Sequence, residues 1–257
     1  MRTKSYPTDL TDAQWKRLRP LLPAAKPGGR PRSVDLREVL NGIFYIVRGG
    51  GSWRMMPHDL PPWSTCYDYF WKWRNSGIWQ QIHDRLRTQV RHHAGKHKSP
   101  SAAILDSQSV KTAEGGPKGF DMAKKVSGRK RHLLVDTLGL LLAVLVTAAG
   151  VQDRDGGLAV LQQVNLSYPR WTKIWADEAY RAVVPEAPRA CLARLEIVSR
   201  TEPGFVVQPK RWVVERTFAW LGGYRRLSKD YQRLTCSSES MIQASMSHLM
   251  LNRLCRA

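Results

Sequence analysis

The first third of the chain carries apolar positions that recur with the period of a helix. In residues 35–49 the apolar side chains lie three or four positions apart, as on one face of a helix; they are Leu36, Val39, Leu40, Ile43 and Ile46. Asp35 before this stretch is typical of a helix start, and the glycines at 49–51 are typical of a helix end. The pattern predicts a helix between these two signals.

Three further helices are predicted in the same part of the chain. Thr11, with Gln14 three positions later, has the form of a capping box and predicts a helix over residues 12–19. Residues 64–73 and 78–92 form the other two, separated by the turn residues 75–77. Several short helices rich in Arg and Lys resemble a helix-turn-helix module, in which we favour residues 64–73 as the helix that enters the major groove.

Tryptophan is frequent in this helical part. Trp at helical spacing in a small domain indicates a core, and stacking on nucleic-acid bases is the alternative. The residues concerned are Trp53, Trp63, Trp71, Trp73 and Trp79. We expect the core role.

After a linker rich in His and Lys that ends at Pro100, the pattern changes to short apolar runs between turns. Strands are predicted at 102–110, 131–135, 140–147, 172–176 and 195–199, the second and third as a hairpin, and helices at 156–164 and 210–221. Strands that meander and then alternate with helices predict an α/β fold with a mixed sheet flanked by helices. We therefore expect a small all-helical domain at 1–97 and an α/β domain at 98–257.

The charge of the chain points to a polyanionic partner. There are 41 Lys and Arg against 21 Asp and Glu, a formal net charge of +20. Both parts contribute, with 18 basic against 7 acidic residues in 1–100 and 23 against 14 in the remainder. Nucleic acid is the first expected partner. A membrane surface is the rival polyanion, but the most apolar run, 138–149, is too short to cross a bilayer.

The cysteines and the glycines exclude several classes of site. Four Cys lie far apart with no CxxC pair, so no zinc knuckle or disulfide framework is indicated, and a reducing cytoplasm, in association with the nucleoid, is the expected location. No Gly-rich phosphate-binding motif is present, so we expect no nucleotide cofactor. The histidines His92, His93 and His97 could be a metal cluster, but a basic linker is the expected explanation.

Three carboxylates are the candidate chemistry of the α/β part. Asp106 and Asp177 each follow an apolar run that reads as a buried strand, and buried acids are unfavourable unless something compensates them. Each alone could simply cap a turn. Glu215 lies on the helix predicted at 210–221, on the same face as Arg211, with which it could form a surface ion pair.

Taken together, the three acids indicate more than each alone. Two Asp on adjacent strands and a Glu on a later helix can hold two Mg²⁺ ions about 3.5–4 Å apart, an arrangement suited to attack at a phosphodiester.

Five ordered blocks resemble DDE transposases of bacterial insertion sequences, in the group with a compact catalytic domain. They are residues 103–111 (AILDSQSVK), 128–136 (GRKRHLLVD), 151–156 (VQDRDG), 177–180 (DEAY) and 211–221 (RWVVERTFAWL). The resemblance covers nearly the whole chain. It implies an RNase H-like catalytic domain, two Mg²⁺ or Mn²⁺ ions, binding to terminal inverted repeats, DNA strand cleavage and transfer, and work as an oligomer. It also implies that Asp106, Asp177 and Glu215 are the catalytic, metal-binding acids.

A related signature of such enzymes places Tyr, Arg, Glu and Lys at fixed helical spacing. Arg211 precedes Glu215 by four as expected, but Gln208 stands in the Tyr position and Gly222 in the Lys position. Phosphate contacts are therefore expected from Arg211 and from three substitutes, since Arg binds phosphate with two hydrogen bonds: Arg216, Arg225 and Arg226. Solvated surface charges are the alternative.

A second basic cluster is expected to follow the DNA backbone as a flexible loop. Its members are Lys124, Lys125, Arg129, Lys130 and Arg131. A merely solubilising loop is the alternative. Nearby, we expect Asp153 and Asp155 to cap a helix, Glu178 to point away from Asp177, and Asp136 to belong to the hairpin turn.

Two other functions share some of these features. A DNA-binding regulator, or an inactive copy of a transposase, would have the same charge without using the acids. A nuclease that cleaves RNA or RNA–DNA hybrids would share the carboxylates but gives no role to a helical module suited to duplex DNA.

Overall fold

The computed structural model describes residues 4–25, 28, 32–113, 115–198 and 210–255, and all four predicted N-terminal helices are present. They are α1 (Asp12–Leu18), α2 (Leu36–Gly49), α3 (Trp63–Asn75) and α4 (Ile78–His93). Both hydrogen bonds of the Thr11–Gln14 capping box form, and Asp35 caps α2. Gly50 ends α2 at a φ of 82°, a left-handed conformation that favours glycine.

The tryptophans divide between core and surface. Trp53, Trp73 and Trp79 are buried, as expected, whereas Trp63 and Trp71 are exposed on α3. The core interpretation is therefore confirmed for three of the five.

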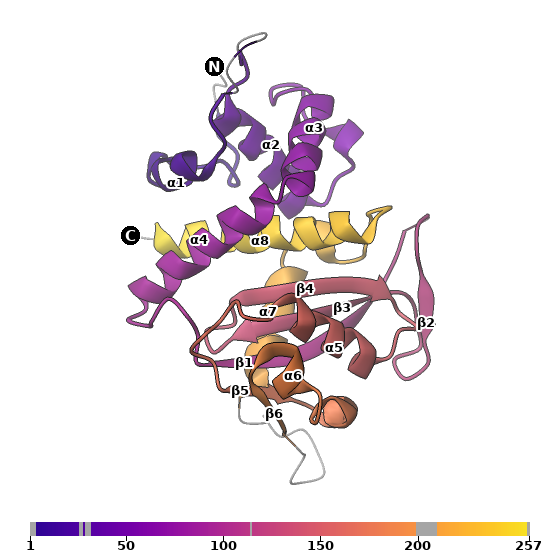
Figure 1. The fold of residues 1–257 in the computed structure, drawn as a ribbon. Helices are drawn as coiled ribbons and strands as arrows, with labels where there is room; N and C mark the ends of the chain where they lie inside the picture. The colour runs from indigo at the N-terminus through magenta and orange to yellow at the C-terminus, as the bar shows by residue number, and fades with distance from the viewer. Residues whose placement is uncertain (1–3, 26–27, 29–31, 114, 199–209, 256–257) are drawn as a thin grey trace.

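A mixed sheet forms the second part of the molecule (Figure 1). Its strands are β1 (Ala102–Lys111), β2 (Gly119–Asp121), β3 (Val126–Asp136), β4 (Leu141–Ala148), β5 (Lys173–Ala176) and β6 (Arg194–Ile197). The order is β2–β3–β1–β5–β6, and β4 also pairs with β3. Strands β1, β5 and β6 run parallel, whereas β3 is antiparallel to β1, β2 and β4. The predicted hairpin is present, and Asp136 Oδ1 accepts hydrogen bonds from the turn amides of Leu138 and Leu140.

Helices cover both faces of this sheet. Side chains along a strand point alternately to the two faces, so neighbouring residues of β1 pack against different helices. Ala103 and Leu105 of β1 pack on the face covered by α5 (Asp153–Gln163) and α6 (Ala187–Cys191). Ala102 and Ile104 pack on the opposite face, with α7 (Trp212–Gly222) and α8 (Thr235–Leu254). Short 3-10 turns occur at Arg19–Leu21, Trp53–Met55, Glu178–Val183 and Arg225–Leu227.

The C-terminal helix α8 joins the two parts of the molecule. It lies between the N-terminal helices and the sheet (Figure 1), and one continuous core includes residues of α2, α4, α8, β3 and β4. Arg91 of α4 adds a buried ion pair with Asp136 of the hairpin turn. The change from helices to strands falls between α4 and β1, close to the expected boundary at 97/98, but the two parts share their core. Within the described ranges, no helix is long and apolar enough to cross a membrane.

The expectation of a basic loop at 124–131 is wrong for three of its five members. Arg129, Lys130 and Arg131 lie on β3 and are at most 5% exposed. Arg129 pairs with Asp230 at 3.2 Å and donates to the carbonyl oxygens of Gln232 and Arg233. Such buried cations are held by internal acceptors and cannot reach DNA phosphates without unfolding the strand.

Arg131 and Lys130, which follow Arg129 on β3, are also held by internal acceptors. Arg131 donates to the carbonyl oxygens of Leu227 and Lys229, and Lys130 pairs with Asp153 at 2.8 Å on the other face of the sheet. The hydrogen bonds of Arg129 and Arg131 thereby hold the segment before α8 against β3.

The expected capping role of Asp153 and Asp155 is also wrong. Helix α5 begins at Asp153 itself, so both acids lie in its first turn and Gln152 is the N-cap residue, without a side-chain cap. Asp153 accepts a hydrogen bond from Ser107 Oγ at 2.8 Å. The predicted strand end at Ser199 lies outside the described residues.

Glu239, at the contact between α8 and the sheet, makes the stability of the folded protein depend on pH. Its Oε1 atom accepts a hydrogen bond from the Val146 amide at 2.9 Å on β4, and burial raises its pKa from 4.5 to about 7. Between these values the folded protein holds a proton that the unfolded chain releases, so stability falls as pH rises through the window.

We therefore expect Glu239→Gln to keep a side-chain oxygen that accepts from the Val146 amide but to remove the loss of stability with rising pH. Its free energy of unfolding should match that of the wild type near about pH 4.5 and exceed it by about 3 kcal/mol near about pH 8. Urea denaturation followed by tryptophan fluorescence at several pH values measures the difference. A difference that does not change with pH would contradict the assignment.

A second prediction concerns the buried Arg129. Replacement by Ala leaves Asp230 charged and without its guanidinium in the interior, so we expect a loss of about 3–5 kcal/mol in the free energy of unfolding. The matched control is Lys125→Gln at an exposed position of the same basic cluster, expected to change stability by less than about 0.5 kcal/mol. Equal losses in the two variants would argue against a structural role for Arg129.

Candidate active site

The parallel pairing of β1 and β5 sets two of the predicted acids side by side. Ala102 pairs with Lys173 and Ile104 with Trp175. Two positions further along the same register, Asp106 comes opposite Asp177, which follows the last residue of β5. Each acid has the parity of Ile104 and Trp175, so both carboxylates lie on the face that carries α7.

A guanidinium group lies between these two carboxylates. Arg211 Nη2 is 3.4 Å from Asp106 Oδ2 and 3.3 Å from Asp177 Oδ2. Arg211 is the N-cap residue of α7, so that helix places its charge beside the middle of β1 and the end of β5. The side chains of Arg211 and Asp106 are 13% and 14% exposed and that of Asp177 is 30% exposed, so the pair is accessible to solvent from the Asp177 side.

Burial dominates the electrostatics of Asp106. Desolvation raises the pKa of its carboxyl to about 6, and the negative charge of Asp177 acts in the same direction. Arg211 and the backbone amide of Ser107 lower it, because both stabilise the ionised form. The site is therefore a place where negative charge is concentrated and a cation is favoured.

Glu215 is placed differently from the two aspartates. It lies on α7 one turn beyond Arg211, above the same face of the sheet, but its side chain is exposed. Within the described residues, no three Asp, Glu, His or Cys side chains are grouped closely enough to hold a metal ion. The structure thus brings Asp106 and Asp177 together, whereas Glu215 is exposed on α7 and is not grouped with them.

The donor set fits a divalent metal in part. Oxygen ligands from carboxylates are what Mg²⁺ and Mn²⁺ prefer, and two carboxylate oxygens here already converge on one positive centre, the Arg211 nitrogen. Asp106 and Asp177 could hold such an ion, and Glu215 is the acid on α7 that could complete the set.

A polar network that the sequence analysis did not predict lies behind β1. Ser107 Oγ donates to Asp153, Lys130 pairs with Asp153, and Lys124 Nζ lies 3.2 Å from the Ser107 carbonyl oxygen. The hydroxyl of Tyr180 is buried close by, and burial raises its pKa well above 10. The network fixes the strand residue next to Asp106. The unbroken polar runs at 106–109 of β1 and 129–132 of β3 were the available signal.

The remaining basic candidates differ in their exposure. Lys124, Lys125 and Arg225 are exposed. Arg216 is half-buried, stacks between Trp212 and Trp220, and donates to the Leu138 carbonyl oxygen. Arg226 is 9% exposed and donates to the Gly51 carbonyl oxygen, so it is a structural residue and not a surface contact.

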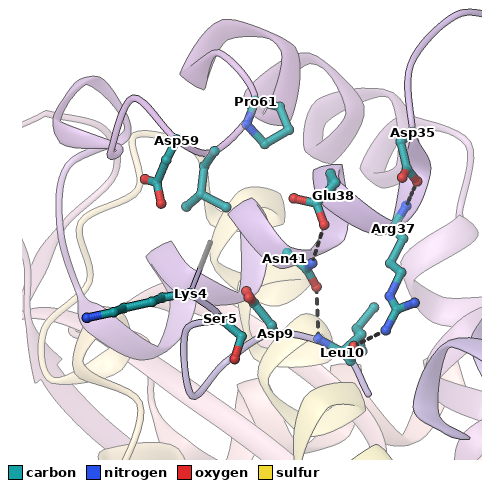
Figure 2. A pocket seen from close by; sticks show the side chains of 11 residues that line it. Lys4, Ser5, Asp9, Leu10, Asp35, Arg37, Glu38, Asn41, Asp59 and Pro61 are labelled. Carbon is teal, nitrogen blue, oxygen red and sulfur yellow. Dashed lines mark hydrogen bonds between the residues drawn. The ribbon is translucent and has the colours of Figure 1, made fainter. Parts of the chain in front are cut away.

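A pocket of about 800 Å³ in the helical part is unsuited to phosphate (Figure 2). Asp9, Asp35, Glu38 and Asp59 are among its lining residues. Asn41 joins Glu38 to the Leu10 amide within it. Lys4 and Arg37 also line it, but the acids are more numerous, and we assign the pocket to the packing of α2 against the N-terminal segment and not to the candidate site.

Two family models match this chain. The model described as "Putative transposase of IS4/5 family (DUF4096)" matches residues 10–83. The model described as "Transposase DDE domain" matches residues 97–250, more than half of the chain. The two matches fall in the helical part and in the part built on the sheet.

Individual relatives point to the same family. The "Insertion element IS402 uncharacterized 16.2 kDa protein" of Burkholderia cepacia is 31% identical over 117 residues, which are 42% of this chain and 77% of the relative. The "Putative transposase for insertion sequence element IS402" of the same organism is 32% identical over 145 residues, 51% of this chain and 65% of the relative. The "Uncharacterized protein y4sN" of Sinorhizobium fredii is 27% identical over 73 residues, 28% of this chain and 58% of the relative.

The last two matches span less than two thirds of the relatives' own length. The family model over residues 97–250 and the mixed sheet with helices on both faces agree with the expected RNase H-like catalytic domain. The chain belongs to the DDE transposases of the IS4/5 family, enzymes that cut DNA and transfer the cut strands.

Proposed function

We propose that this protein binds the terminal inverted repeats of an insertion sequence and catalyses cleavage and strand transfer at their ends with two divalent metal ions. Asp106, Asp177 and Glu215 are the proposed ligands. The observation that carries the proposal is the convergence of Asp106, within β1, and Asp177, directly after β5, on one positive centre. We further propose that the protein works as an oligomer on DNA.

The residues of the site have separate roles in this proposal. Asp106, Asp177 and Glu215 would hold Mg²⁺ or Mn²⁺, which would supply activation of the attacking oxygen and stabilisation of the leaving oxygen. Asp106 provides the most rigidly placed carboxylate, because it lies within β1 and pairs with Leu133 of β3. Asp177 and Glu215 lie nearer to solvent, where the scissile phosphate arrives.

The exposed cations are placed to hold the DNA backbone. Lys124 and Lys125 occupy the turn between β2 and β3, and Lys124 also reaches Ser107, next to Asp106. Arg225 is exposed in the turn after α7, the helix that carries Glu215. Contacts of this kind position DNA without reading its sequence.

The first test is cleavage of a labelled duplex that carries the element's own ends, with Mg²⁺, Mn²⁺ or EDTA. We expect Asp106→Asn, Asp177→Asn and Glu215→Gln each to lower the cleavage rate by about 10³-fold or more while DNA binding persists, because each removes a metal ligand. Glu178→Gln is the matched control: this acid is adjacent to Asp177 but is exposed and paired with Arg181. Its activity should stay within about twofold of the wild type.

Two outcomes would contradict the proposal. Full activity of the Glu215 variant would remove that acid from the site. DNA binding without cleavage by the wild-type protein would favour a regulator or an inactive copy.

A second test concerns the exposed cations. We expect Lys125→Gln and Arg225→Gln each to weaken duplex binding and to reduce the slope of log K against log salt concentration by about 1, because each removes one phosphate contact. Lys173→Gln is the control, since Lys173 already pairs with Glu196 at 2.6 Å. Fluorescence anisotropy over a range of salt concentrations gives the slopes. Equal slopes for all four proteins would show that these cations do not contact DNA.

A further inference from the structure

We propose that Arg211 is a placeholder for the metal: its guanidinium holds the Asp106–Asp177 pair together in the metal-free protein and must leave when a metal ion binds. The inference rests on the proposed function, because it takes the two aspartates as metal ligands. It assigns Arg211 a positioning role before the reaction, in addition to the contact with phosphate expected from the sequence.

The first step of the argument is the shared contact. One nitrogen, Arg211 Nη2, lies 3.4 Å from an oxygen of Asp106 and 3.3 Å from an oxygen of Asp177. Two carboxylates that face one point repel each other unless a positive charge lies between them. The neighbouring cation, Lys210, lies over the ring of Trp175 at 4.2 Å, so the charge between the aspartates comes from Arg211.

The second step is that the guanidinium and a metal cannot share this place. Carboxylate oxygens bind Mg²⁺ at about 2.0–2.1 Å in a compact octahedral shell. An ion bound to these two oxygens would lie close to the position of Nη2 and would repel its charge. Metal binding and the Arg211 contact are therefore alternatives. The free energy needed to break the contact weakens the binding of the metal ion.

The third step is where the displaced side chain can act. Arg211 precedes α7 and lies one helical turn before Glu215, at the entrance where Asp177 is exposed to solvent. A guanidinium released there faces the path of the DNA backbone, and Arg binds a phosphate with two parallel hydrogen bonds. Loading of the site with metal thus makes a phosphate-binding group available next to the acids.

The test compares wild-type protein with Arg211→Gln without DNA. Titration calorimetry with Mn²⁺ should show at least about threefold tighter binding by the variant, the factor expected for a partly exposed ion pair. Without metal, the Tm of the variant should be lower by about 2 °C, because the aspartates then face each other without a counter-ion. Saturating Mn²⁺ should remove that difference.

Two controls separate the possible failures. Arg181→Gln removes a cation four residues from Asp177 that pairs with the exposed Glu178, and its Mn²⁺ affinity should equal that of the wild type. Asp177→Asn should lose Mn²⁺ binding. If Asp177→Asn binds as tightly as the wild type, the proposed metal site is wrong. If it loses binding while Arg211→Gln has unchanged affinity and Tm, only the placeholder role is wrong.

A final measurement concerns the released side chain. Ca²⁺ serves as a probe cation in binding assays with labelled duplex. We expect Ca²⁺ to increase the DNA affinity of the wild type by at least about threefold more than that of Arg211→Gln, since only the wild type gains a phosphate-binding guanidinium. An equal increase in both proteins would overturn this part of the proposal.

Discussion

The parallel pairing of β1 with β5 is the constraint on which the site depends. It brings Asp106 and Asp177, 71 positions apart in the printed sequence, to the same edge and the same face of the sheet. Two carboxylates so placed are unfavourable alone, and a positive charge has to lie between them. In this structure Arg211 supplies the charge, and α7, which carries it, packs on that face through Val213, Val214 and Leu221.

Positive charge is used in two different ways in this molecule. Part of it lies inside, where Arg129 and Arg131 bind backbone carbonyl oxygens of the segment before α8 and Arg91 pairs with Asp136. These groups connect the sheet, the hairpin turn and the helices. The net charge of +20 therefore overstates the number of cations that can meet DNA, and the exposed Lys124, Lys125 and Arg225 are better candidates than the buried arginines.

The helix α8 shows a limit of pattern analysis. It was not predicted, although it is 20 residues long and packs between the N-terminal helices and the sheet. A helix that is covered on several sides has no single apolar stripe, and here serines such as Ser240, Ser245 and Ser247 are buried next to Met246 and Met250. Apolar periodicity detects helices that have one solvent-exposed face, such as α2, and misses a helix that is buried on several sides, such as α8.

The sequence by itself determined the local structure. The period of apolar side chains and the capping residues predicted α1 to α4, the hairpin and five of the six described strands, because these signals act between near neighbours. The blocks around Asp106, Asp177 and Glu215 indicated the family. Tertiary structure decided which charges meet: parity along β3 turned Arg129 and Arg131 inward, strand register set Asp106 beside Asp177, and α7 placed Arg211 between them. Such contacts depend on burial and on distances between segments far apart in the chain, which local patterns do not contain.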